Sequence, residues 1–187
     1  LDEWDGAVLS GLSRGQYAAR LMSQARFPLE DSFYPLVERR IREADLVLST
    51  TTALQKKFGG EVIAMGVDTR KFAPQPPEKI AALRRELGLD GFRVVVFGGV
   101  VRPHKGVEQV LEAMILLGRE DLKFLVVGPV TDHLADMMKD SRYEGLIQVV
   151  GAPLSDRTGI NAGIHQRMAD YLDLADAIIL PLRDEPL

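Results

Sequence analysis

The sequence predicts an α/β protein with a doubly wound parallel sheet, and two observations support this fold class. In the second part of the chain, short apolar segments alternate with segments whose apolar residues recur at helical spacing. The apolar segments are apolar at nearly every position, which is typical of parallel strands that helices cover on both faces. The expected strands are residues 93–97, 123–127, 147–150 and 177–180. The expected helices are residues 78–87, 105–117, 131–139 and 165–175.

The first part of the chain predicts the end of another, partial domain. Its expected elements are a helix at residues 31–44, a strand at 45–50, a helix at 51–58 and a strand at 61–65. A break follows, in which Pro74, Pro76 and Pro77 each fix their own φ angle and restrict the residue before them. We therefore expect an interdomain linker there, with a first domain over residues 1–74 and a second over residues 75–187.

Composition narrows the possible functions. The 187 residues are 46% hydrophobic and 27% charged, as in a globular protein that buries its own core. The absence of cysteine excludes a disulfide framework, a cysteine-based zinc site and a thiol nucleophile, and it fits a reducing cytoplasm. A net charge of −4 without a basic run argues against a nucleic-acid partner. No apolar run is long enough to cross a membrane, and no metal-ligand spacing is present. The chain does not begin with Met, which suggests a fragment of a longer protein.

Residues 94–107 carry the pattern that points most directly to chemistry: a buried strand, two glycines, a short basic loop and a helix start. Gly98 and Gly99 let a ligand approach the backbone closely. The N-terminus of a helix offers free N–H groups and partial positive charge, which suit phosphate. Arg102 can bind phosphate with two parallel hydrogen bonds, and Lys105 adds a point charge. The segment thus predicts a diphosphate site, although a plain turn with an exposed lysine has the same pattern.

The order of motifs around this segment resembles a known family. Lys105-Gly106-Val107 is followed on the expected helix by Val-Leu-Glu-Ala at residues 110–113. This order is similar to the second-domain signature of the retaining glycosyltransferases of the GT-B fold, in the group-1 or family-4 set. Other segments that resemble the family, in the family's order, are residues 44–49, 65–74, 124–128, 149–151 and 171–181.

The resemblance implies a Rossmann-like half of a GT-B fold that binds a nucleotide-sugar donor, preceded by the end of the acceptor-side domain. The parent enzyme would transfer a sugar from a nucleotide-diphospho-sugar to an acceptor hydroxyl, with retention at the anomeric carbon. It would need no cofactor and no metal ion. The fragment alone would be inactive, and the enzyme would work in the cytoplasm, either free or peripheral at the inner membrane surface.

The resemblance also assigns site residues. Lys105 and Arg102 would neutralise the charge that builds on the leaving diphosphate, and Glu185 would lie near the reacting sugar. The usual family pattern has Arg directly after the glycine, where this chain has Val100, so Arg102 is the candidate substitute. The expected nucleotide-binding residues are Gly98, Gly99, Lys105 and Gly128.

Two other functions are compatible with the expected fold. The first is a nucleotide-binding α/β module without catalysis, which nothing in the fragment separates from an enzyme. The second is a nicotinamide-dependent oxidoreductase. The missing GxGxxG after Phe97, and the lack of an acidic ribose partner about 20 residues further on, argue against it.

Overall fold

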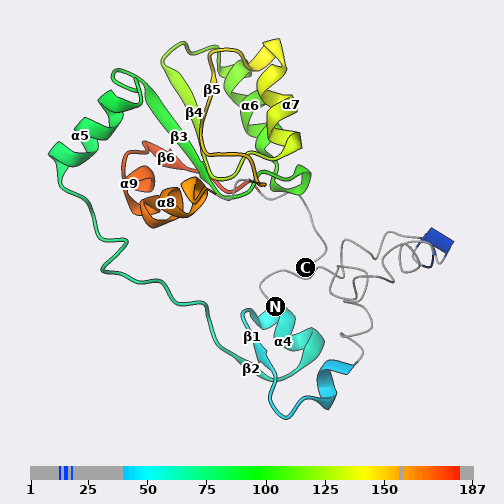
Figure 1. Ribbon diagram of the computed structural model, residues 1–187. Coiled ribbons are helices and arrows are strands. Elements are labelled where there is room, and N and C mark those ends of the chain that lie inside the picture. The colour runs from blue at the N-terminus through cyan, green and yellow to red at the C-terminus, as the bar shows by residue number, and fades with distance from the viewer. Residues whose placement is uncertain (1–12, 14, 17, 19–39, 156–157, 182–187) are drawn as a thin grey trace. The chain divides into compact units, whose positions relative to one another are not determined.

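The computed structural model describes residues 13, 15–16, 18, 40–155 and 158–181 (Figure 1). The chain divides into two compact units, with the division between Val67 and Asp68. This division lies ahead of the proline cluster at which the sequence predicts the linker. The assignment of the two parts to an acceptor side and a donor side stays a prediction, and most of the helix expected at residues 31–44 lies outside the described residues.

The first unit contains a short parallel pair of strands. Its elements are η2 (Ile41–Glu43), β1 (Leu48–Ser49), α4 (Thr52–Phe58) and β2 (Glu61–Val62). Thr51 caps α4, because its hydroxyl oxygen accepts a hydrogen bond from the backbone N–H of Leu54 at 3.2 Å. A Cβ on Gly60 would lie 2.1 Å from the carbonyl oxygen of Val47, so only glycine fits this turn. The helix predicted at residues 51–58 is confirmed as α4, and the strands predicted at 45–50 and 61–65 are shorter than predicted.

The second unit is built on one parallel sheet. Its elements are α5 (Pro77–Glu86), β3 (Arg93–Gly98), η3 (Pro103–Lys105), α6 (Val107–Leu117), β4 (Leu122–Val127), α7 (Asp132–Lys139), η4 (Ser141–Tyr143), β5 (Ile147–Val150), α8 (Ile160–Gln166), α9 (Met168–Asp173) and β6 (Ala177–Ile178). The strand order is β5-β4-β3-β6, and every neighbouring pair is parallel. The predicted fold class, a doubly wound α/β sheet, is confirmed.

Both faces of the sheet are buried, as the nearly continuous apolar strands predict. Phe97 and Val126 contribute to a core cluster with α6 and α7. Val96 and Leu125 belong to the second cluster, with α5, α8 and α9. Figure 1 shows α6 and α7 on one side of the sheet and α8 and α9 on the other. The strand side chains therefore alternate between two apolar cores.

The strand order creates one topological switch point. The chain passes from β3 to β4 and β5 on one side of the sheet, and β6 then pairs on the other side of β3. The direction of progress across the sheet thus reverses between β3 and β6. In open α/β sheets, ligands bind in the crevice at the carboxyl ends of the strands at such a point. The loop after β3, which holds the predicted site residues, lies at this position.

Asp176 fixes the start of β6 against the start of β3. Its carboxylate accepts a hydrogen bond from the backbone N–H of Val94 at 2.9 Å and forms ion pairs with Arg93 at 3.2 Å and Arg84 at 3.5 Å. The Val94 N–H bond, followed by the two arginines, holds the pKa of this carboxyl below its usual value. The backbone N–H of Asp176 donates in turn to the carbonyl oxygen of Val94. The two strands that flank the switch point are therefore fastened together at their amino ends.

Two predicted helices differ from the structure. The helix expected at residues 105–117 begins only at Val107, because Gly106 adopts a left-handed conformation with φ 64° and separates it from a preceding 3₁₀ turn. The helix expected at residues 165–175 is two short helices, α8 and α9, and α8 begins earlier, at Ile160. Arg167 separates them with φ −94° and ψ 10°, which lies outside helical geometry. Across the described part of the chain, none of the helices is long and apolar enough to cross a membrane.

Candidate functional site

Glycines at the carboxyl edge of the sheet let three loops pack backbone against backbone. The N–H of Gly99 donates to the carbonyl oxygen of Val127 at 2.9 Å, and the N–H of Gly128 donates to that of Val150 at 3.0 Å. A Cβ on Gly128 would lie 2.3 Å from the carbonyl oxygen of Gly99. A Cβ on Gly151 would lie 1.9 Å from that of Gly128. Side chains at these two positions would push the loops after β3, β4 and β5 apart.

The three glycines predicted to bind the nucleotide, Gly98, Gly99 and Gly128, differ in their surroundings. Gly128 is buried, and its missing side chain makes room for the loop after β3. Gly99 is half-buried with φ 136°, and the atom nearest to a Cβ there would belong to the Phe97 ring, 4.0 Å away. Gly98 is exposed, and a Cβ there would lie 3.3 Å from the sulfur of Met168. The backbone of Gly98 and Gly99 is thus the more accessible to a ligand, whereas Gly128 is buried against the backbone of Gly99.

The basic loop after β3 ends in a single 3₁₀ turn, η3, rather than in the first turn of α6. The backbone N–H of Lys105 donates to the carbonyl oxygen of Arg102 at 2.9 Å, which closes this turn. The side chain of Arg102 is exposed, and within the described ranges its guanidinium makes no ion pair. Lys105 is half-buried. The prediction that Lys105 opens the helix is wrong, because the left-handed Gly106 follows it and α6 starts only at Val107.

A groove of about 590 Å³ runs along this edge of the sheet. Its walls come from the loop after β3, the start of α7 and the chain after β5. Thr131 holds two of these walls together: its hydroxyl donates to the carbonyl oxygen of Val101 at 3.0 Å and accepts from the N–H of Leu134 at 3.2 Å. Arg102 lines the groove on one side, and the exposed Leu154 lines it on another. Asp132 and His133 also line the groove, which therefore combines charged and polar side chains with apolar surface. Of the predicted site residues that the structure describes, Arg102 lines it, whereas Gly98, Gly99, Lys105 and Gly128 do not.

The chain after β5 is held in place by a side-chain amide. The Asn161 carbonyl oxygen accepts from the backbone N–H of Ala152 at 3.0 Å. Its amide nitrogen donates to the carbonyl oxygen of Pro153 at 3.2 Å. This Asn and Thr131 were not predicted as site residues. A threonine before an acidic residue at a helix start is a recognisable capping pattern, but the second bond of Thr131 joins two distant loops.

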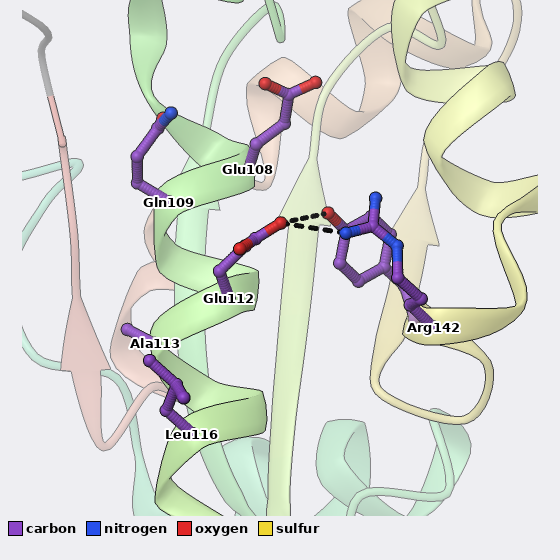
Figure 2. Close-up of a pocket in the computed structure, with 7 residues that line it drawn as sticks. Glu108, Gln109, Glu112, Ala113, Leu116 and Arg142 are labelled. Atoms are coloured by element: carbon purple, nitrogen blue, oxygen red, sulfur yellow. Dashed lines mark hydrogen bonds and ion pairs between the residues drawn. The ribbon is translucent and has the colours of Figure 1, made fainter.

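A second hollow, of about 490 Å³, lies on the outer face of α6 and contains none of the predicted site residues (Figure 2). Its arginine, Arg142, lies 3.0 Å from Glu112 and 2.7 Å from Asp140. Tyr143 donates to the same Glu112 carboxylate at 3.5 Å, and burial raises the pKa of its hydroxyl. Because two carboxylates already neutralise Arg142, this hollow is poorly suited to a phosphate group. The groove at the carboxyl edge is the better candidate for an anionic ligand.

Glu185, the predicted glutamate near the reacting sugar, lies outside the described residues. Among the residues that the structure describes, no group of three or more His, Asp or Glu side chains is arranged to hold a metal ion.

Comparison with known proteins gives one curated relative and several related structures, while no family model matches the chain. The relative is the GDP-mannose-dependent monoacylated alpha-(1-6)-phosphatidylinositol monomannoside mannosyltransferase of Corynebacterium glutamicum. It is 28% identical over 127 residues, which are 66% of this chain and 30% of the relative. The chain therefore matches less than a third of the length of a sugar-transferring enzyme.

The related structures include those of Anabaena Alr3699/HepE. The complex with UDP and glucose has a TM-score of 0.64 and 18% sequence identity, covering 100% of this chain and 47% of that chain. The complex with UDP-glucose gives the same values, 0.64, 18%, 100% and 47%. At this identity the similarity concerns the fold, and it agrees with the doubly wound sheet described above. This chain spans less than half of the HepE chain.

Proposed function

We propose that this chain is the donor-binding part of a glycosyltransferase. The whole enzyme transfers a sugar from a nucleotide-diphospho-sugar to an acceptor hydroxyl with retention of the anomeric configuration. The observation that carries the proposal is the switch point between β3 and β6, where Gly98, Gly99 and a basic turn follow β3 and where Arg102 of that turn lines a groove of suitable size. The mannosyltransferase relative supports the reaction class.

The diphosphate of the donor lies against the Gly98–Gly99 backbone in this proposal, with Arg102 and Lys105 beside it. As the bond between the sugar and the diphosphate breaks, negative charge grows on the leaving oxygen. These two cations stabilise that charge more in the transition state than in the ground state, which lowers the barrier. This is work that a divalent cation performs in other enzymes, so the proposal includes no metal ion. Glu185 remains the proposed glutamate near the reacting sugar.

The nucleoside occupies the groove of about 590 Å³ beside the basic turn. Pockets of roughly 300–1,000 Å³ with apolar walls and a few polar groups are typical of small-molecule sites. The groove has this character, because Leu154 is 59% exposed on one wall while Arg102 marks the end nearest the phosphates. The base lies against Leu154 and Pro153 in this arrangement.

Calorimetric titration of the chain with GDP, UDP and ADP tests the proposal. We expect measurable binding of at least one nucleotide, with a dissociation constant in the micromolar to millimolar range, because one domain supplies only part of the site. A folded sample that releases no heat with any of the three nucleotides would contradict the proposal. Binding by the chain without sugar transfer by the whole protein would instead indicate a non-catalytic nucleotide-binding module.

A further inference from the structure

Gly106 and Pro181 bring two distant parts of the chain into backbone contact. Gly106 has φ 64° and ψ 22° and lies between the basic turn and α6. A Cβ at this position would be 1.9 Å from the carbonyl oxygen of Pro181 and 3.1 Å from its carbonyl carbon. Pro181 follows β6, whose end is fixed to β3 by the bond from the N–H of Ile179 to the carbonyl oxygen of Val96 at 2.9 Å. Any side chain at Gly106 would therefore displace the chain that leaves β6.

This contact lies at the switch point of the sheet. The basic turn with Arg102 and Lys105 follows β3, and Pro181 follows β6, the strand on the other side of the reversal. These two segments form the two flanks of the crevice in which a doubly wound sheet binds its ligand. The position of one flank relative to the other thus depends on the absence of a side chain at a single residue.

We propose that Gly106 is a positioning residue for the nucleotide site, a role that rests on the proposed function. Because Gly106 has no side chain, the Pro181 carbonyl oxygen packs against its Cα, and the chain after β6 lies at a fixed place beside the basic turn. The groups on the two flanks then meet the bound diphosphate in one geometry. Moving the carbonyl away from a new Cβ to an ordinary contact distance requires a shift on the order of 1 Å. Displacements of this size at a binding or catalytic centre weaken function by as much as about 100-fold.

The same helix provides a matched control. Gly118, at the other end of α6, has nearly the same left-handed backbone, with φ 61° and ψ 28°. A Cβ on Gly118 would have no neighbour within 4 Å. Alanine at either position therefore strains the backbone in the same way. Only alanine at Gly106 also pushes against Pro181.

The experiment compares the affinity of wild-type, Gly106→Ala and Gly118→Ala chains for GDP and UDP, at a temperature at which circular dichroism shows all three to be folded. We expect Gly118→Ala to stay within about twofold of wild type and Gly106→Ala to bind at least about tenfold more weakly. In two-dimensional amide spectra, the Ile179 and Leu180 resonances should move in Gly106→Ala and stay in place in Gly118→Ala. A purely structural glycine would lower the unfolding temperature without changing the affinity of the folded protein.

A second variant serves if Gly106→Ala does not fold. Pro181→Gly leaves Gly106 intact but frees the chain that it positions, so we expect nucleotide affinity to fall several-fold. Wild-type affinity in Gly106→Ala, or in Pro181→Gly where that variant replaces it, would overturn the positioning role and leave the proposed function standing. A wild-type chain that binds neither nucleotide would contradict the proposed function itself, and the positioning role with it.

Discussion

Two hollows of the second unit, the groove at the carboxyl edge and the hollow on α6, each contain an arginine, but only one of these arginines has its charge available. Arg142, on the outer face of α6, is held by Glu112 and Asp140 at 3.0 and 2.7 Å. Arg102, at the carboxyl edge, is exposed and forms no ion pair with any residue in the described part of the chain. An arginine beside a hollow therefore indicates an anion site only where no neighbouring carboxylate already neutralises it.

The two hollows also differ in how closely a ligand can approach the backbone. The outer face of α6 is regular helix, in which each N–H beyond the first turn is used by a carbonyl of the preceding turn. At the carboxyl edge, the chain leaves the sheet at Gly98 and Gly99, which have no side chains of their own; Gly98 is exposed and Gly99 half-buried, and Met168 lies against one side of Gly98. A ligand can approach backbone groups at this edge, whereas on the helix face it meets side chains. The carboxyl edge is therefore the place at which we expect the ligand to bind.

The largest effect is expected from removing both cations of the basic turn. Each charge-assisted hydrogen bond contributes about 1.5–3 kcal/mol, so Arg102→Ala combined with Lys105→Ala should weaken nucleotide binding on the order of 100-fold. Because Arg102 is exposed and Lys105 only half-buried, the midpoint of thermal unfolding should change little. Calorimetry gives the affinity, and a thermal melt gives the stability.

Unchanged affinity in that double variant would remove the distinction between the two arginines. A large loss of stability would show instead that Lys105 holds the loop after β3 in place. The single variants Arg102→Ala and Lys105→Ala separate the two contributions, and Lys105→Ala alone should weaken binding while leaving the melt nearly unchanged.

A much smaller effect, of a different kind, is expected from Arg142→Ala. Nucleotide affinity should stay at the wild-type value, and thermal stability near pH 7 should fall slightly, because exposed ion pairs contribute little. Arg142 holds the pKa of the Asp140 carboxyl below its usual value through hydrogen bonds to its side chain. The contribution of the pair is therefore complete above the unfolded pKa of Asp, about 3.9, and is lost as the pH falls through the lower folded value.

Thermal melts of wild type and Arg142→Ala between pH 2 and 7 check this result. The difference between the two proteins should shrink toward the acid end. A difference that grows as the pH falls would mean that Arg142 acts through something other than its carboxylate partners. Weakened nucleotide binding in Arg142→Ala would mean that the anion site is the hollow on α6 and not the groove with Arg102.

Local sequence patterns predict the sheet and most of its helices because those elements depend on neighbouring residues. Residues 147–150 were expected as a strand and form β5 with the same bounds, since a short apolar run between turns has few alternatives. Thr131 caps α7 where the helix was expected to begin. The break at Arg167 was missed, because both sides of it carry helix-forming residues and only backbone geometry shows the interruption.

The candidate site was less predictable, because its geometry depends on residues far apart in the sequence. The pattern around Gly98, Gly99 and Lys105 predicts a site at the carboxyl edge of the sheet from local sequence alone. It does not show that Gly128 supports the neighbouring loop, or that Gly106 admits the Pro181 carbonyl, since those contacts join segments brought together only by the fold. The assignment of Arg102 and Lys105 to the diphosphate stays a prediction until a nucleotide is bound.

The most direct measurement is a titration of the isotopically labelled chain with GDP and UDP, followed by two-dimensional amide spectra. We expect the strongest shifts at Gly98, Gly99 and the turn from Arg102 to Lys105, with smaller shifts along the groove near Leu154. Strong shifts confined to α6 around Glu112 and to Arg142, or saturating nucleotide with no shift at Gly98 and Gly99, would contradict this expectation.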